Sequence, residues 1–293
     1  MTEAGGITNG VNNLVRSIAI GSTGIYVGGD FTQAGGTPAF YAALYNTAVT
    51  PNIWQNLGVN WSVGNVSTID YANGTVFLGG GFFTVNGWPG NGIIKKEGSG
   101  SWQAMGSGSS VGVTKLIANT NGEVFALGDF SADAGPSANH IAKWNGTMWI
   151  PLGSEPFNYI PSADIGLYGT NTIYTTRFEF QNPEYLYGNG IYKWDGLNWS
   201  GLGEGVGDYW TSTMQIKTLA WYNSKLIAGG NFKTAGDKFI SSLAQYDGDT
   251  WFNVGGNSTT PNYFINKLLV VDNNLYAAGY FTNIGGTNSN NIA

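Results

Sequence analysis

Apolar and small residues recur along the chain with a regular spacing. Two apolar residues, a small pair, one variable residue and a phenylalanine make up the recurring phrase, as in IYVGGDF and VFLGGGF. Short apolar segments bounded by glycine are typical of β-strands. The six copies end at Phe31, Phe82, Phe130, Phe178, Phe232 and Phe281. Six copies in 293 residues give a period of about 49 residues.

Other features keep register with this phenylalanine. In the third copy, the apolar-small pair Ile141-Ala142 is followed by an Asn145-Gly146 turn, then by Trp149 and by Leu152-Gly153. Asn-Gly and Asp-Gly dipeptides favour tight hairpin turns. Each repeat therefore predicts about four short antiparallel strands. The tryptophans in this register are expected to pack between repeats, in a structural role: Trp54, Trp102, Trp149, Trp199 and Trp251.

Four antiparallel strands per repeat of roughly 40–50 residues is the pattern of a propeller blade. We therefore expect an all-β fold, a six-bladed β-propeller formed as a single domain by residues 1–293. A β-helix has much shorter coils than this period. A fragment of a longer repeat array remains open as an alternative.

The ends of the chain suggest how such a ring could close. The last residues, Ile292-Ala293, fall in the third strand of the sixth repeat. Ala4-Gly5-Gly6 aligns with Val254-Gly255-Gly256 of a fourth strand. We expect the N-terminal strand to complete the sixth blade, which would also remove an exposed sheet edge.

Composition narrows the function. Net charge is −6, and Arg16 and Arg177 are the two arginines, so the basic patch of a nucleic-acid-binding protein is missing. The chain has no cysteine, which excludes disulfides and thiolate metal sites. We see no apolar run long enough for a transmembrane helix and no signal peptide at residues 1–6. We expect no cofactor, no nucleic-acid partner and no membrane insertion.

Some aromatic residues fall outside the repeat pattern. Trp61, Trp88 and Trp210 lie in expected loops at Val59–Gly64, Asn86–Gly92 and Gly205–Ser212, and Tyr209 adjoins Trp210. Loop aromatics that a blade does not require can anchor ligands, although packing on a neighbouring loop explains them equally well. The fourth repeat departs most from the pattern, since IYTTRF lacks the glycine pair. Its aromatic and charged residues complete the candidate ligand-binding set: Arg177, Glu179, Tyr185 and Tyr187.

The phrases GGDFTQAGG, GDFSADAG, IAKWNGTMWIPLG and YKWDGLNWSGLGEG resemble a repeat of secreted and cell-surface propellers. These are kelch-like proteins of bacteria, with relatives among Rax2-type cell-polarity proteins of fungi and in some giant viruses. The resemblance covers nearly the whole chain. It implies an extracellular or cell-surface scaffold that binds something, and it brings no catalytic residues.

We therefore expect a non-enzymatic recognition module that binds a glycan or a partner protein. A structural subunit of a fibre, sheath or virion, assembling with its own copies, is the alternative. A glycosidase-like enzyme comes third, because two arginines cannot form the carboxylate clamp of a sialidase. His140 is the single histidine, so a catalytic triad or a histidine metal site lacks partners.

Overall fold

The computed structural model describes residues 10–59, 64–82, 84–85, 88–109, 112–128, 140–153, 164–169, 172–176, 190–203, 205–207, 215–255 and 261–293. The chain forms two compact units, Met1–Glu155 and Pro156–Ala293. The described residues contain strands and turns and no helix, and so none of them forms a helix that could cross a bilayer.

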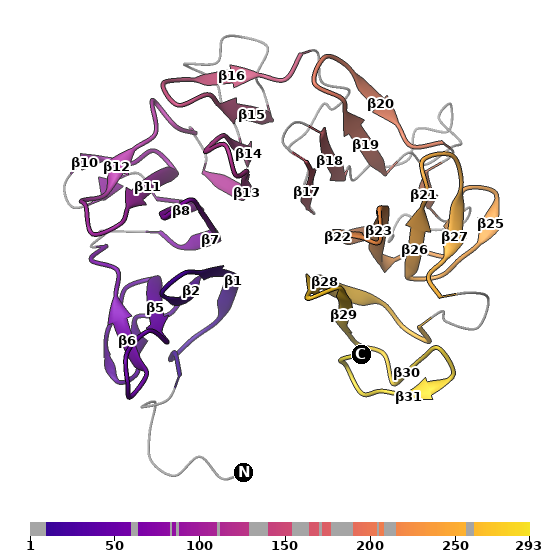
Figure 1. Ribbon diagram of the computed structural model, residues 1–293, viewed down its shortest axis with the longest axis horizontal. Helices are drawn as coiled ribbons and strands as arrows, with labels where there is room; N and C mark the ends of the chain where they lie inside the picture. The colour runs from indigo at the N-terminus through magenta and orange to yellow at the C-terminus, as the bar shows by residue number, and fades with distance from the viewer. Residues whose placement is uncertain are drawn as a thin grey trace. The chain divides into compact units, whose positions relative to one another are not determined.

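The first repeat shows the plan of the molecule. Four strands form an antiparallel sheet in the order β1 (Val15–Gly21), β2 (Gly24–Gly29), β5 (Ala42–Asn46) and β6 (Ile53–Asn56). A small hairpin of β3 (Gln33–Ala34) and β4 (Thr37–Pro38) lies in the connection between β2 and β5. Figure 1 shows this sheet and its hairpin in indigo.

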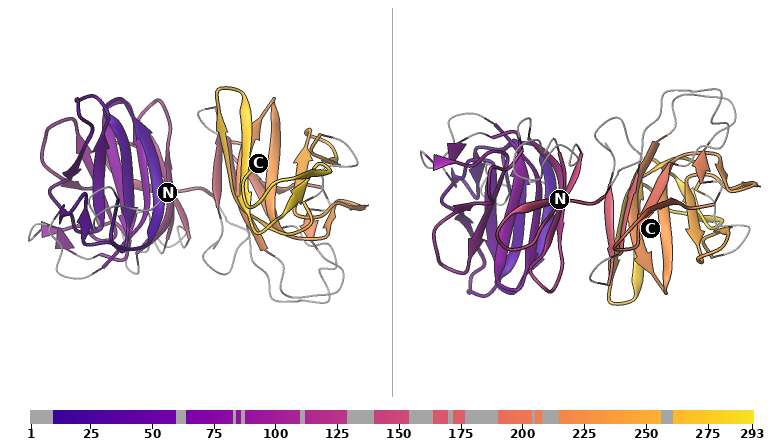
Figure 2. Two further views of the ribbon diagram at one scale, coloured as in Figure 1. Left: turned by 90° about the horizontal axis from the view of Figure 1, so that it is seen from below. Right: turned by 90° about the horizontal axis from the view of Figure 1, so that it is seen from above.

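Two further sheets of the same order complete the first unit, and Figure 2 shows the unit from the side with its sheets stacked face to face. The second contains β7 (Val66–Ala72), β8 (Thr75–Gly80), β11 (Ile93–Glu97) and β12 (Gln103–Ala104), with a hairpin of β9 (Thr84–Val85) and β10 (Trp88–Pro89). The third contains β13 (Val113–Ala118), β14 (Val124–Gly128), β15 (Ile141–Trp144) and β16 (Trp149–Pro151).

The second unit follows the same plan. Its first sheet contains β17 (Ile165–Tyr168), β18 (Thr172–Thr176), β19 (Ile191–Trp194) and β20 (Trp199–Gly201). Its second contains β22 (Gln215–Tyr222), β23 (Lys225–Asn231), β26 (Leu243–Tyr246) and β27 (Trp251–Asn253), with β21 (Val206–Gly207), β24 (Thr234–Ala235) and β25 (Lys238–Phe239) in a small side sheet. The sixth repeat contains β28 (Ile265–Val271), β29 (Asn274–Gly279), a bridge from Ala278 to Ile292, and a hairpin of β30 (Asn283–Ile284) and β31 (Thr287–Asn288).

The glycine pair of the recurring phrase has a steric cause. A Cβ atom on Gly29 would overlap the carbonyl oxygen of Leu14, because the first strand bulges towards the second at this point. The first glycine of the pair instead lies against the next repeat. A Cβ atom on Gly79 would lie 2.7 Å from a methyl group of Val113, so glycine lets adjacent sheets approach closely.

Adjacent sheets are joined by a repeated hydrogen bond between their first strands. A polar side chain near the start of the first strand of one repeat accepts a backbone N–H from the first strand of the next. Three of the four acceptors lie at a bulge of that strand, whereas Asp164 directly precedes β17, which has no bulge. The donor and acceptor pairs are Ile69 and Ser17, Leu116 and Thr68, Leu219 and Asp164, and Leu268 and Thr218, at 3.0–3.2 Å. Each bond gives a backbone N–H group of one sheet an acceptor on the neighbouring sheet.

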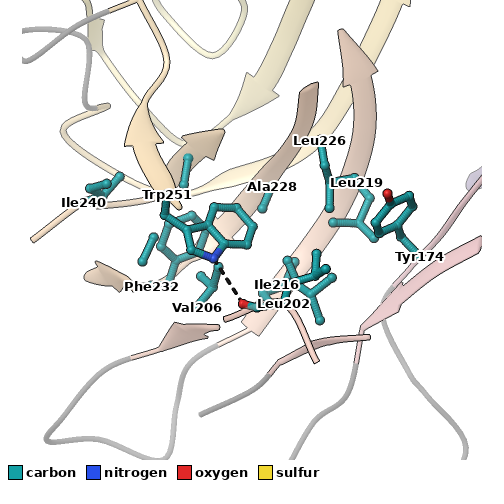
Figure 3. Packing of buried hydrophobic residues seen from close by; sticks show 13 residues of the cluster. Tyr174, Leu202, Val206, Ile216, Leu219, Leu226, Ala228, Phe232, Ile240 and Trp251 are labelled. Carbon is teal, nitrogen blue, oxygen red and sulfur yellow. Dashed lines mark hydrogen bonds between the residues drawn. The ribbon is translucent and has the colours of Figure 1, made fainter. Parts of the chain in front are cut away.

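A second hydrogen bond joins the outer parts of neighbouring repeats. The indole Nε1 of Trp149 donates to the carbonyl of Met105 at 2.7 Å, and that of Trp102 donates to Leu57 at 2.8 Å. Trp251 makes the corresponding contact to Leu202 at 3.4 Å within the core of the second unit (Figure 3). Each acceptor is the apolar residue that directly follows the fourth strand of the preceding repeat, so the tryptophan fixes the spacing of the sheets.

The fourth-strand tryptophan also pairs with an aromatic ring of the third strand. Ring centroids lie 5.0–5.5 Å apart in four repeats: Tyr45 and Trp54, Trp144 and Trp149, Trp194 and Trp199, Tyr246 and Trp251. In three of these repeats the third-to-fourth turn uses an oxygen of Asn145, Asp195 or Asp247 that accepts two backbone N–H groups. The glycine of this turn has φ +106° at both Gly146 and Gly196.

Candidate functional site

Each repeat sheet has two ends with different connections. At one end lie the tight turns that join the first strand to the second and the third to the fourth. At the other, which we call the connection end, the first strand begins and the second strand ends. The small hairpins and the segments that lead into the next repeat are attached here, so long insertions concentrate at this end.

One of the eight candidate ligand residues from the sequence lies within the described part of the chain. Trp88 lies on β10 of a hairpin, rather than in the loop that the sequence suggests. The other seven lie outside the described residues. They follow β6, β18 or β21 in the chain: Trp61, Arg177, Glu179, Tyr185, Tyr187, Tyr209 and Trp210.

The connection end of the sixth repeat is held by an asparagine. Asn262 Oδ1 accepts the backbone N–H groups of Thr282 and Asn283 at 3.0 and 3.1 Å, and its Nδ2 donates to Thr282 Oγ1 at 2.9 Å. The backbone N–H of Tyr280 donates to the carbonyl of Phe264 at 3.0 Å. These bonds tie the start of β28 to the end of β29.

We call the start of β28 and the end of β29, joined by these hydrogen bonds, the frame. Three aromatic side chains project from it. The ring centroid of Phe264 lies 5.2 Å from that of Tyr263 and 4.9 Å from that of Tyr280. Tyr263 is 58% exposed and Tyr280 is 63% exposed. We call Tyr263, Phe264 and Tyr280 the aromatic cluster. Its tilted rings suit the quadrupole preference of aromatic pairs, and two of the three rings face water.

A lysine from the preceding repeat completes the cluster. Lys217 Nζ lies 4.4 Å from the ring centroid of Phe264 and donates to Asn266 Oδ1 at 2.8 Å. A cation at this distance over an aromatic ring is held by the ring's negative face. The arrangement places an ammonium group and an amide beside exposed rings, which together can stack on a ligand and hydrogen-bond to it.

The first repeat has the same frame with different side chains. Asn12 accepts from Thr32 and Gln33 as Asn262 does from its partners. Instead of tyrosine, an aspartate precedes the anchor phenylalanine: Asp30 accepts two hydrogen bonds of 2.7 Å from Arg16. The Arg16 guanidinium holds the pKa of the Asp30 carboxyl below its usual value, against a smaller opposing effect of burial. The aspartate and arginine neutralise each other here.

The aromatic cluster was missed by the sequence analysis, although one signal was present. Tyr280 stands where other repeats have Asp30, Gly81 or Asn231, and this variety argues against a role shared by all repeats. A role confined to one repeat needs the spatial proximity of Tyr263 and Phe264, which the repeat alignment alone does not reveal. Among the described residues, no group of three or more histidine, aspartate or glutamate side chains could hold a metal ion.

Three solved structures with a similar fold are distant in sequence. The WD40 β-propeller domain of Doa1 aligns with a TM-score of 0.51 at 12% identity, covering 91% of this chain and 76% of that chain. YCF48 bound to D1 peptide gives 0.51 at 16% identity, covering 90% and 74%. The extracellular domain of a protein described as a hybrid two-component system from B. thetaiotaomicron gives 0.50 at 12% identity, covering 94% and 38%. These similarities show a propeller fold.

Sequence comparison identifies the family. A comparison with curated proteins finds no match. The model of the Rax2 C-terminal β-propeller domain matches residues 3–163, which are 161 of the 293 residues. Together with the stacked four-stranded sheets, this match confirms the expected all-β propeller. The chain belongs to the family of the Rax2 C-terminal β-propeller domain.

Proposed function

We propose that this protein is a non-enzymatic recognition module of the cell surface or extracellular space. It binds a glycan or a partner protein through the connection end of its repeats. The propeller fold is consistent with a binding module, and propellers place ligands on such ends while the strands serve as scaffold. The membership of the Rax2 family and the extracellular domain among the structural neighbours support the location.

One observation carries the proposal. Tyr263 and Tyr280 are more than half exposed on a frame that, in the first repeat, holds Asn13 and Asp30 instead. The frame therefore does not require aromatic residues. Exposed rings at a fixed position have a free-energy cost in water that a ligand would remove. YCF48 bound to D1 peptide shows that a propeller with similar topology can take a peptide.

The non-enzymatic part of the proposal rests on the chemistry of the described carboxylates. Asp70 Oδ2 accepts the backbone N–H of Ala118 at 2.7 Å, and Asp164 Oδ2 accepts that of Leu219 at 3.0 Å. Both carboxylates support backbone groups between repeats. Burial raises the pKa of Asp70, with the hydrogen bonds from Ala118 and Tyr71 opposing that rise. Burial in a contact between repeats is enough to raise a carboxyl pKa, so the raised pKa of Asp70 does not indicate catalysis.

Two screens test the proposal. The purified protein is applied to a printed glycan array and, separately, used to capture peptides from a random display library. Specific binding in one screen, without turnover of the bound glycan, is the expected result. A glycosidase would release shortened products from bound glycans over time, which would contradict the non-enzymatic assignment.

Self-assembly is the second candidate, and exposed apolar side chains favour it. Ile18 is 60% exposed in the first repeat, whereas the equivalent Ile69 of the second is 4% exposed. In the sixth repeat Tyr276 is 45% exposed, whereas the equivalent Ile227 of the fifth is fully buried. A ring closed within one chain would cover these faces of the first and sixth repeats. If copies of the chain associate through the faces instead, light scattering during size-exclusion chromatography would show a mass above 31.1 kDa that rises with concentration.

We also propose that the six repeats form one six-bladed ring, with the N-terminal segment beside the first repeat. The indole Nε1 of Trp54 is buried and has no hydrogen-bond partner among the described residues, whereas Trp102, Trp149 and Trp251 each donate to a carbonyl at the end of the preceding fourth strand. By the same rule, Trp54 requires a carbonyl from a segment that takes the place of a fourth strand.

The described contacts of Gly10 and Val11 indicate which carbonyl this is. The Gly10 carbonyl accepts from Gly35 as that of Gly205 accepts from Gly236, and Val11 pairs with Ala34 as Val206 pairs with Ala235. Counting back three residues from Gly205 gives Leu202, and counting back three from Gly10 gives Ile7. This register aligns Ile7, rather than Ala4, with the acceptor position. Both residues lie outside the described part of the chain.

A further inference from the structure

We infer that the aromatic cluster of Tyr263, Phe264 and Tyr280, with Lys217 and Asn266 beside it, is a carbohydrate-binding site. The inference rests on the proposed recognition function and assigns its location and ligand class. The ligand is a glycan whose pyranose ring stacks on an exposed tyrosine ring. Its hydroxyl groups hydrogen-bond to the neighbouring hydroxyl, ammonium and amide groups.

The site is built before a ligand arrives. Asn262 makes three hydrogen bonds across the frame, and the Tyr280 N–H donates to the Phe264 carbonyl. A tyrosine has two side-chain torsions to order, and its backbone here is already fixed. Preorganised aromatic residues lose little conformational entropy on binding, which leaves more of the contact energy for affinity.

The other repeats supply an internal comparison. The position of Phe264, directly before the first strand, is occupied by Leu14, Asn65 and Gly112 in the first three repeats. The position of Tyr280, directly before the anchor phenylalanine, is occupied by Asp30, Gly81 and Asn231 in three others. A packing role that belonged to the repeat would select aromatic residues more than once. These aromatics are particular to the sixth repeat.

The polar surroundings favour a sugar over a peptide. Peptides are commonly recognised along a strand edge or in an apolar groove with side-chain pockets. Here Lys217 lies over the Phe264 ring and donates to Asn266, and Asn262, which precedes Tyr263, donates to Thr282. The ammonium of Lys217 keeps up to two further donors and Asn266 keeps its amide N–H groups, which match the acceptors of sugar hydroxyls. The ring faces match the apolar C–H surface of a pyranose.

Native affinity electrophoresis tests this inference. Gels are cast with one of four soluble probes: laminarin, yeast mannan, hydroxyethyl cellulose or polygalacturonate. The test variant is Tyr263→Ser with Tyr280→Ser, both at exposed positions. Two matched controls are Phe239→Ser, an aromatic of the same unit that is 86% exposed, and Leu14→Ser, which occupies the position of Phe264 on the frame of the first repeat.

We expect at least one probe to retard the wild-type protein. In the double variant the dissociation constant for that probe should rise about tenfold or more, the effect of losing roughly 1.4 kcal/mol of contact energy. Both controls should keep the wild-type constant. Equal thermal unfolding midpoints of all variants show that each protein is folded.

Three results would overturn the inference, and they separate it from the proposed function. Undiminished retardation of the double variant would place the glycan site elsewhere, with the recognition function intact. Retardation by none of the probes, together with peptide capture that the double variant loses, would make this a peptide site. Binding to neither glycans nor peptides would remove the recognition function as well.

Discussion

The hydrogen bond from tryptophan to the preceding repeat can be tested by removing the indole N–H. Trp149→Phe keeps an aromatic ring but leaves the carbonyl of Met105 without its 2.7 Å donor. Trp149 is 1% exposed, so water cannot replace that donor at the surface. Leaving a buried polar group unsatisfied costs about 1–3 kcal/mol, and the smaller ring adds a cavity term.

The same substitution at Trp54 tests whether the N-terminal segment supplies the acceptor of its indole N–H. If the N-terminal segment supplies a carbonyl, Trp54→Phe lowers the free energy of unfolding about as much as Trp149→Phe does. If residues 1–9 are deleted, the indole N–H of Trp54 has no acceptor. Trp54→Phe is then close to neutral, because it removes a buried donor that was already unsatisfied.

A double-mutant cycle with thermal unfolding measures the difference. The four proteins are wild type, Trp54→Phe, the deletion of residues 1–9, and both changes together. We expect a coupling energy of about 1–2 kcal/mol between the two changes. At this chain length each kcal/mol shifts the unfolding midpoint by about 2–4 °C. A coupling energy of zero, with a full cost for Trp149→Phe, would refute the assignment of the N-terminal segment as partner of Trp54.

Three further substitutions, two of them with a control variant, test the contacts between repeats. Gly79→Ala should lower the unfolding midpoint in a thermal melt, because the new Cβ atom would lie 2.7 Å from methyl groups of Thr68 and Val113. Its control is Gly146→Ala, at a turn residue with open space around it and φ +106°, which measures the cost of backbone strain alone. Thr218→Val should cost about 1–3 kcal/mol in urea unfolding, since the Leu268 N–H loses its acceptor at 3.1 Å, whereas Thr218→Ser should restore most of that loss. Asp70→Asn keeps an oxygen for the Ala118 N–H and removes a buried charge. Because burial raises the pKa of Asp70, its contribution to stability is largest below the ordinary aspartate pKa of about 3.9 and falls as pH rises through the raised value. Urea midpoints measured from pH 3.5 to 7 should therefore decline less with pH in Asp70→Asn than in wild type, and equal slopes would contradict the effect of burial on Asp70.

The strand plan of the repeats could be predicted because glycine and tryptophan occupy positions where few alternatives fit. The pair Gly28-Gly29 and the turn at Asn145-Gly146 each follow from local sterics, and the recurring tryptophan marks the fourth strand. The short hairpins between the second and third strands were not predicted. Their strands have two residues each, too short for an alternating pattern to show.

The candidate site could not be predicted in the same way. The aromatic cluster combines Tyr263 and Phe264 with Tyr280 across a hairpin, and with Lys217 from the preceding repeat. Repeat periodicity identifies residues that every repeat shares, whereas this cluster depends on residues that one repeat has alone. The register proposed for the N-terminal segment differs by three residues from the alignment of Ala4-Gly5-Gly6 with Val254-Gly255-Gly256, because it is counted from the contacts of Gly10 and Gly205.

The central claim is that ligands bind at the connection end, and a comparison of the two ends tests it most directly. Binding of the strongest ligand from the glycan and peptide screens is measured by biolayer interferometry. The connection-end variant is Tyr263→Ser with Tyr280→Ser. The turn-end variant is Met148→Ser with Leu197→Ser, two exposed apolar residues of third-to-fourth turns. We predict that affinity falls about tenfold or more in the connection-end variant and is unchanged in the turn-end variant. Loss of binding in the turn-end variant alone would contradict the account.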